Sequence, residues 1–260
     1  NVGSVTDMGY MFAGCLLFNQ AINGWDVRAV TTMRSLFFGA TSFNQPLNGW
    51  QVGAVTTMEE MFSNADAFNG NIANWDVRNV TTFRRMFFMA PRFNQNIGSW
   101  QPTKALSTSQ MFYGATDFNG NIGGWDVQMV NDMSGMFYGA SHFNQDIGNW
   151  QVGAVTDMST MFRAAVAFNQ DISRWNVSKV LDMSMMLYGT TAFNQNISGW
   201  NVSTVTNMGL MFHETSAFNQ DLSSWDIRAV TTLYGMFDHA TAFNQSLSSW
   251  GAKLNTGVDL

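Results

Sequence analysis

The chain has 260 residues, of which 46% are hydrophobic and only 12% are charged, and its formal net charge is −6. Its 12 Lys and Arg residues are scattered and form no basic stripe, so we expect neither nucleic acid nor an anionic membrane surface as a partner. Apolar runs such as Met86 to Ala90 are far shorter than the about 20 residues that span a bilayer, which argues against direct membrane insertion. Cys15 has no second cysteine to pair with, and we expect its small side chain in the core.

A strict 25-residue period organises the sequence. All ten tryptophans are 25 residues apart, from Trp25 to Trp250, and a Phe–Asn pair recurs in the same register, first at 18–19. Such a period is typical of a solenoid, because one short unit cannot bury its own apolar side chains and stacked neighbours must share a core. We therefore expect residues 1–250 to form one repeat domain of about ten units. At 251–260 the pattern dissolves, and we expect a degenerate end or cap there.

Each repeat combines two hydrophobic periodicities. Trp25 and Val27 alternate with the polar Asp26, as in a strand. Further along, apolar residues recur at spacings of three and four, as on one face of a helix, namely Val30, Met33, Leu36, Phe37 and Ala40. Thr31 is a candidate N-cap, and Gly39 suits the left-handed position that ends a helix. The sequence thus predicts an α/β fold with one short parallel strand and one short helix in each repeat.

Two segments carry a family resemblance. WDVQMVNDMSGMFYGASHFNQDIGNW at 125–150 and WNVSTVTNMGLMFHETSAFNQDLSSW at 200–225 both look like repeats of the pattern W-D-V, V-T-x-M, M-F and F-N-Q-D. The pattern resembles the repeats of the BspA-like leucine-rich-repeat family over nearly the whole chain, with departures at 102–108, at Leu187 and at 251–260. The resemblance implies a leucine-rich-repeat-like, right-handed solenoid used for adhesion or recognition at the cell surface or outside the cell. It implies neither a catalytic site nor a cofactor.

The residue after each tryptophan is polar and is expected to point away from the core, onto the open face of the predicted sheet. Alternation of Asp with Gln separates carboxylates that would otherwise lie about 5 Å apart. This polar row reads Asp26, Gln51, Asp76, Gln101, Asp126, Gln151, Asn176, Asn201 and Asp226, and it is flanked by Arg28, Arg78 and Arg228. Two interpretations remain open, a solvated row that favours solubility and a hydrogen-bonding surface for a sugar chain or an extended protein partner.

The asparagine after each recurring phenylalanine is predicted to belong to an internal ladder that satisfies backbone groups of successive repeats. Leaving such groups unpaired in the interior costs about 1 to 3 kcal/mol each. The ten residues are Asn19, Asn44, Asn69, Asn94, Asn119, Asn144, Asn169, Asn194, Asn219 and Asn244. We likewise expect the tryptophans in the core rather than on a glycan-binding platform.

Acidic residues and histidines give little sign of a metal or catalytic site. Several aspartates recur in consecutive repeats and permit a calcium hypothesis, but no loop concentrates oxygen ligands as an EF-hand does. These aspartates are Asp132, Asp157, Asp182, Asp146 and Asp171. The histidines, His142, His213 and His239, occupy different positions of the repeat, without a Cys or Glu partner at metal or triad spacing. We therefore expect no enzyme, no metal and no cofactor.

Two function classes follow. The first is a noncatalytic recognition or adhesion domain that binds a protein or glycan through the polar row. The alternative is a structural subunit, because the ends of a solenoid expose unpaired backbone and apolar side chains unless they are capped. Such a subunit would associate end-on with another copy or pack with neighbouring proteins in a larger assembly.

Overall fold

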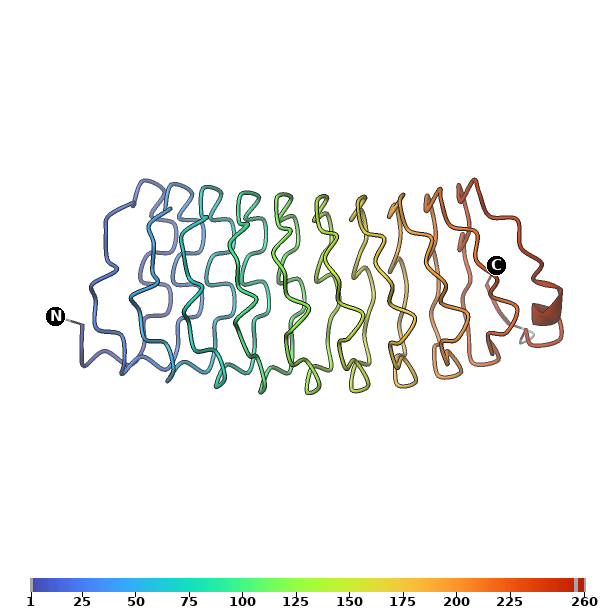
Figure 1. Cartoon of the computed structure of the whole chain (residues 1–260), viewed down its shortest axis with the longest axis horizontal. Coiled ribbons are helices and arrows are strands. Elements are labelled where there is room, and N and C mark those ends of the chain that lie inside the picture. The colour runs from blue at the N-terminus through green and yellow to red at the C-terminus, as the bar shows by residue number, and fades with distance from the viewer. Residues whose placement is uncertain (1, 255–256, 260) are drawn as a thin grey trace.

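A computed structural model describes residues 2–254 and 257–259 as one row of stacked coils with the two termini at opposite ends (Figure 1). Nine isolated parallel bridges connect equivalent residues of successive repeats, from Asp7–Thr32 to Asn207–Thr232, and a tenth joins Thr232 to Asp259. The chain is therefore a repeat solenoid in which each repeat contacts its neighbours. The end segment expected at 251–260 lies partly outside the described residues, which omit 255, 256 and 260.

The helix expected in each repeat is not formed. The only helical element of the described residues is η1, a 3₁₀ helix at Ser248–Trp250. The apolar segment of each repeat is instead a run of overlapping β-turns, each closed by an N–H that donates to the carbonyl three residues earlier. In the repeat 126–150 these bonds join Met136 to Met133, Tyr138 to Gly135 and Ala140 to Phe137.

Stacking explains why β-turns replace the helix. Alternate backbone N–H groups of the repeat 126–150, those of residues 133, 135, 137 and 139, donate to carbonyls of the next repeat at 2.7–3.1 Å. An α-helix would need the same N–H groups for its own carbonyls. The run also requires positive φ angles, which reach 59° at Gly135 and 67° at Gly139 and lie outside the helical region. Where the residue is not glycine, as at Thr160 with φ of 54°, the conformation costs on the order of 1 kcal/mol, which the bonds between repeats offset.

The parallel pairing lies at a different place from the one predicted. The bridges join equivalents of Asp132, whereas the backbone of residues 125–127 makes no hydrogen bond to a neighbouring repeat within the described chain. The in–out alternation of this segment is nevertheless confirmed, since Trp125 and Val127 are buried and Asp126 is not. Alternation reports where side chains point, and it occurs here without a strand ladder. The polar row is therefore a surface row but not the face of a sheet.

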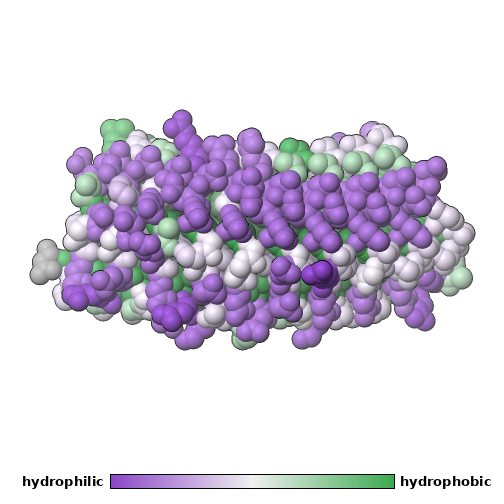
Figure 2. Space-filling model, viewed as in Figure 1, coloured by the Kyte–Doolittle hydropathy of each residue, from purple (hydrophilic) through white to green (hydrophobic). Residues whose placement is uncertain are grey.

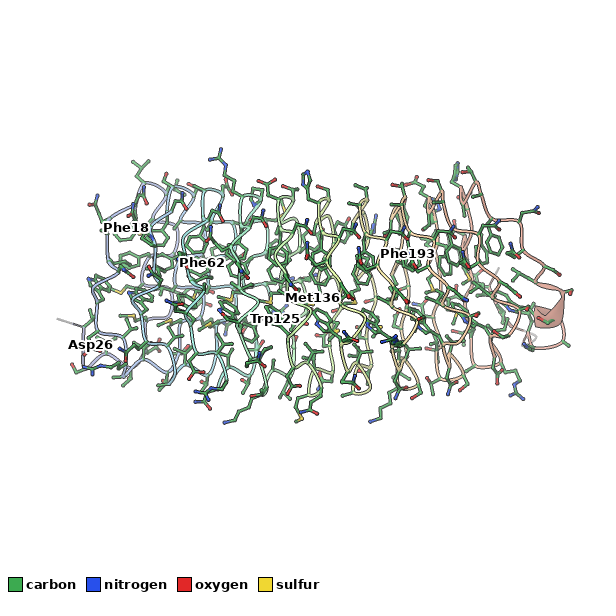
Figure 3. All side chains as sticks on the ribbon, in the orientation of Figure 1. Phe18, Asp26, Phe62, Trp125, Met136 and Phe193 are labelled. Atoms are coloured by element: carbon green, nitrogen blue, oxygen red, sulfur yellow. The ribbon has the colours of Figure 1, made fainter. Side chains whose placement is uncertain are left out.

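The core consists of aromatic rings stacked along the solenoid axis (Figure 3). The ring of Phe137 lies 3.9 Å from that of Phe143 in its own repeat and 5.6 Å from that of Phe162 in the next. Trp125 and Trp150 stack at 6.4 Å with their planes 7° apart. The tryptophans from the second repeat onward are 1–5% exposed, which confirms the expected burial, and Trp25 in the first repeat is half-buried.

Two departures from the repeat pattern behave differently. Cys15 is exposed, so the prediction of a buried thiol is wrong. It lies in the first repeat of the described residues, at the end of the stack, whereas its equivalent Ala40, inside the stack, is buried. The segment 102–108 keeps the common register, because bridges join Ser107 to both neighbours. Thr108, in the position of the recurring methionine, is fully buried there, and its Oγ1 has no hydrogen-bond partner.

Candidate functional site

The polar row lies on the surface of the coil, and Asp26, its first residue, lies at the margin of the molecule near the N-terminal end (Figure 3). Its residues are exposed or half-buried along the whole row. Because the flanking Trp and Val side chains fill the interior, the stack fixes the direction of every side chain in this row. The row therefore presents polar groups at a regular spacing along the solenoid.

The three arginines of the predicted face each bind the aspartate two residues earlier in the same repeat. Arg28 donates from Nε to Asp26 Oδ1 at 2.9 Å and from Nη2 to Oδ2 at 2.7 Å. Arg78 holds Asp76 in the same way, at 2.8 and 2.6 Å, and Arg228 likewise pairs with Asp226. The sequence expectation that these arginines flank the row as separate cations is therefore incomplete, because their charges are neutralised within the repeat.

These pairs stabilise the ionised form of the carboxylates. The hydrogen bonds from the Arg28 side chain and backbone N–H lower the pKa of Asp26 from its usual 3.8 to about 2. The Arg228 side chain does the same for Asp226, and the pKa of Asp76 is lowered by Arg78. All three aspartates are thus charged throughout the physiological pH range.

An open groove of about 510 Å³ lies over the row between Arg28 and Asp76. Gly49 and Gly53 line the groove. A Cβ at Gly49 would lie 2.9 Å from the Asn23 carbonyl oxygen, too close for a side chain without a shift of the backbone. The amide side chains of the groove are Asn48, Gln51 and Asn74. None of these three makes a hydrogen bond with another described residue. The groove therefore has the Arg28–Asp26 ion pair at one end, the Asp76–Arg78 ion pair at the other and, between them, amide side chains without a hydrogen-bond partner among the described residues.

The recurring asparagines form a continuous ladder. The backbone N–H of Asn144 donates to Asn119 Oδ1 at 3.0 Å, and Gln145 Nε2 donates to the same oxygen at 3.0 Å. Equivalent bonds from backbone N–H to Oδ1 join all ten residues from Asn19 to Asn244. The ladder is not interior, because its members are exposed or half-buried, and Figure 2 shows a band of hydrophilic residues running along the solenoid.

The aspartates considered for calcium are used in local turns. Oδ1 of Asp157 accepts from the backbone N–H of Ser159 at 2.8 Å, and the carboxylates at 132, 146, 171 and 182 cap the residue two positions later in the same way. Asp146 and Asp171 line a cavity of about 170 Å³ together with Arg174, whose positive charge disfavours a cation. In the described part of the chain these five residues do not form a group of three potential ligands.

Stacking brings together three side chains that the sequence spacing left apart. His213, Asp238 and His239 place their ligand atoms within 4.8 Å of one another, the one such group of three in the described residues. The expectation that His213 and His239 lack partners is therefore wrong. The missed signal is that His213 and Asp238 occupy the same position of consecutive repeats, which a solenoid places side by side. The third histidine, His142, lies outside this group.

Comparison with known protein families identifies the repeat. Residues 1–100, 45–149, 81–191 and 170–258 each match the family described as "Mycoplasma protein of unknown function, DUF285". The chain belongs to this family. Curated proteins include no match to the DUF285 chain.

Two solved structures are similar in coarse outline. A TLR13–ssRNA13 complex has 10% sequence identity and a TM-score of 0.24, with 89% of the DUF285 chain and 52% of that chain covered. An internalin, InlF, from Listeria monocytogenes has 10% identity and a TM-score of 0.22, with 85% and 81% covered. The DUF285 chain thus spans about half the length of the first of these proteins. In the described residues, no helix has the length and apolar character needed to cross a membrane.

Proposed function

We propose that this chain is a noncatalytic recognition or adhesion domain of the cell surface that binds an extended polar partner, a glycan or a protein, along the polar row. The observation that carries the proposal is the groove between Arg28 and Asp76, where three amide side chains have no hydrogen bond to another described residue. Most other polar groups of the repeat are engaged in stacking or local turns. The motif resemblance to BspA-like repeats supports the same assignment and the proposed place at the cell surface.

The chemistry of the groove favours hydrogen bonding over aromatic stacking. Trp50 lies in its lining but is 2% exposed, so its ring cannot present a face to a sugar. Amides offer both donors and acceptors, and Arg28 and Asp76 are each held in an ion pair, so they add polar groups without a net charge. A neutral hydroxyl-rich glycan or an extended peptide backbone matches this set better than a polyanion does.

We propose a noncatalytic role because the groove lacks a suitable acid–base group. Its carboxylate, Asp76, has a lowered pKa and is held by Arg78, whereas general acid–base catalysis is most efficient with a pKa near the working pH. The stack also holds the row in one arrangement, which suits binding of a partner with a matching repeat.

The groove can be tested by filling it. A Cβ at Gly53 would make only ordinary contact, 3.6 Å from Asp76 Oδ2, so Gly53→Tyr adds a ring to the groove without displacing backbone. The control is Gly153→Tyr, at the same repeat position but outside the groove, where a Cβ would lie 3.2 Å from Asn176 Nδ2 and the flexible amide has to shift slightly. On glycan arrays and in a pull-down screen, we expect Gly53→Tyr to lose the bound partner and Gly153→Tyr to retain it. Equal binding by both variants would show that the partner binds at another surface of the protein.

A second candidate function, a structural subunit that associates end-on, rests on the two ends of the described stack. At the C-terminal end an apolar cavity of about 500 Å³ is lined by Met236, Phe237, Leu247, Trp250 and Leu254 among others. The backbone N–H groups of Gly235, Phe237 and His239 have no hydrogen-bond partner among the described residues. At the other end Leu16 and Leu17 are 57% and 89% exposed.

The two ends are complementary in their hydrogen bonding. In the stack, N–H groups of each repeat donate to carbonyls of the next one. The first described repeat therefore has carbonyls without such a donor, as at Gly9 and Met11, and the last repeat has N–H groups without an acceptor, as at Gly235 and Phe237. A second copy docked head to tail would continue the ladder at residues 235–239, beside Asp259, which already pairs with the backbone of Thr231 and Leu233. Light scattering over a range of concentrations tests this, with Leu17→Asp as the disrupting variant and Ala29→Asp as a control away from the end. A mass that stays monomeric at every concentration removes this candidate.

A further inference from the structure

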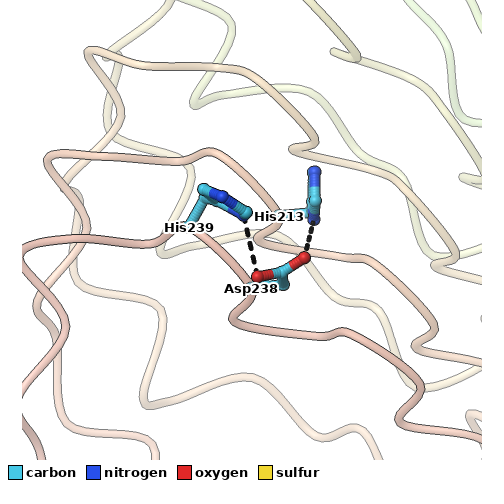
Figure 4. Close-up of side chains that lie close together, drawn as sticks. All are labelled: His213, Asp238 and His239. Atoms are coloured by element: carbon cyan, nitrogen blue, oxygen red, sulfur yellow. Dashed lines mark ion pairs between the residues drawn. The ribbon is translucent and has the colours of Figure 1, made fainter.

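The side chain of His213 is only 13% exposed, and its Nδ1 atom is buried without a hydrogen-bond partner (Figure 4). Nδ1 lies 3.3 Å from Oδ2 of Asp238, in the next repeat. The other carboxylate oxygen, Oδ1, lies 2.8 Å from Nδ1 of His239. Two imidazole nitrogens from adjacent repeats thus lie beside the two oxygens of one carboxylate.

We propose that His213, Asp238 and His239 bind a divalent transition-metal ion, with Zn²⁺ as the best match. Zn²⁺ takes His nitrogen and Asp oxygen ligands at about 2.0 to 2.2 Å, so the ligand atoms of a tetrahedral site lie about 3.3 Å apart. The three ligand atoms lie within 4.8 Å of one another, and His213 Nδ1 and Asp238 Oδ2 are already 3.3 Å apart. Imidazole ligands favour zinc, copper or nickel over the hard cations calcium and magnesium. Three protein ligands leave one position for water.

Glu214 orients the histidine that is least exposed. Its Oε1 atom lies 3.5 Å from Nε2 of His213, on the side of the ring opposite Nδ1. With an ion bound at Nδ1, the ring proton resides on Nε2, where this carboxylate can accept it. A carboxylate behind a metal-binding histidine commonly fixes the ring in this way. Glu214 is therefore a positioning residue of this site rather than one of its three ligands.

The surrounding charges favour a cation. The Asp238 and Glu214 carboxylates contribute two negative charges beside the two imidazoles. The guanidinium group of Arg163 stacks 4.4 Å from the ring centroid of Tyr188, which itself lies 4.4 Å from the His213 ring. The Tyr188 ring therefore lies between the Arg163 guanidinium and the His213 ring, so the positive charge of Arg163 does not contact the proposed metal site.

A bound ion would connect two repeats. His213 comes from the repeat 201–225 and the other two ligands come from 226–250, the last complete repeat. Residue 259 continues the ladder at Thr232 and Leu233, but at the metal ligands the ladder ends, since the N–H groups of Phe237 and His239 have no partner among the described residues. Metal binding would therefore hold the last repeat to the stack and raise its resistance to unfolding.

Titration of the tag-free protein with ZnCl₂ by calorimetry, together with absorption spectra of the Co²⁺-substituted protein, tests the site. The chain has three histidines, so His142→Gln is a matched control that removes the one histidine outside the cluster. Asp238→Asn and His239→Asn remove exposed ligands, and Asn tolerates the left-handed conformation that His239 adopts. Circular dichroism verifies that each variant remains folded.

We expect the wild type and His142→Gln to bind one Zn²⁺ per chain, to show the Co²⁺ bands of a tetrahedral site and to melt at a higher temperature with Zn²⁺. Asp238→Asn and His239→Asn should weaken binding by more than about 100-fold, since loss of an outer-shell partner alone costs about 10- to 100-fold. Glu214→Gln should weaken it by about 10-fold while keeping the tetrahedral spectrum. Absence of binding to the wild type, or equal binding by His239→Asn, would overturn the proposal.

Discussion

The indole Nε1–H of Trp125 donates to the carbonyl of Ile97, 28 residues earlier and in the preceding repeat, at 3.0 Å. The same bond recurs at every tryptophan from Trp50 to Trp250. In the segment around the tryptophans, where the backbone has no ladder, the indoles thus take over the connection between repeats. This explains why a residue as large as tryptophan recurs without exception, since phenylalanine could fill much of the space but could not donate.

Replacement of Trp125 by Phe should therefore destabilise the protein by about 0.5 to 1.5 kcal/mol, the net contribution of one hydrogen bond, because the Ile97 carbonyl still accepts from the backbone N–H of Trp100. Trp125→Ala should cost about 3 to 5 kcal/mol because it also removes the buried ring. Urea denaturation followed by circular dichroism measures the change. Trp25→Phe is the matched control, because Trp25 is half-buried and its indole has no hydrogen-bond partner among the described residues. Equal losses for Trp25→Phe and Trp125→Phe would contradict the role assigned to the bond.

Asn119 gives a second test of how repeats are connected. Asn119→Ala removes the acceptor for the Asn144 backbone N–H and for Gln145 Nε2. Because the ladder is exposed and water can replace the lost oxygen, we expect a loss of about 0.5 to 1.5 kcal/mol in the free energy of unfolding rather than the full cost of a buried unpaired group. Asn119→Asp keeps the acceptor oxygen and should retain most of the stability. A melting temperature that does not change in Asn119→Ala contradicts the ladder, and partner binding should be the same in both variants.

The core could be predicted from the sequence because a fixed period gives every copy of a residue the same environment. The Trp and Val positions and the exposed row between them follow from that argument. The local backbone could not be predicted, because apolar spacings of three and four fit overlapping β-turns as well as a helix. The sign of φ separates the two, and at residues such as Thr160 and Met185 no glycine marks the left-handed positions.

The candidate sites were predictable only in part for a related reason. The surface location of Asp26 follows from alternation, but its pairing with Arg28 depends on side-chain geometry within a turn that the sequence pattern had assigned to a strand. His213 and Asp238 were missed because ligand spacings are normally sought within one loop or helix. In a solenoid, equivalent positions of adjacent repeats are neighbours, so a search at a separation of one full period would have found them.

The Arg28–Asp26 pair predicts a specific acid titration. Arg28→Gln should raise the pKa of the Asp26 carboxyl from about 2 towards 3.8, because the Arg28 side chain is the largest cause of the lowering. A lowered folded-state pKa means that this carboxylate favours the folded state above about pH 4 and loses that contribution as the pH falls towards 2. Both groups are exposed to solvent, so the effect on stability is small and NMR titration of the carboxyl is the suitable measurement. In the same variant Asp226 should keep its pKa of about 2, and a parallel change there would show that the effect is not local.

Thr108 predicts a substitution that stabilises the protein. Its side chain is fully buried and Oγ1 has no hydrogen-bond partner, so Thr108→Val removes an unsatisfied hydroxyl with little change of shape. We expect the free energy of unfolding to increase by about 1 to 3 kcal/mol, the cost of such a group. Thr190→Val is the matched control, because Thr190 is equally buried but its Oγ1 donates to the Phe162 carbonyl at 2.6 Å. That variant should lose about 1 kcal/mol, and chemical denaturation of the two proteins should therefore give changes of opposite sign. A loss of stability in both would mean that the Thr108 hydroxyl is satisfied in solution, by water or by a local shift of the turn.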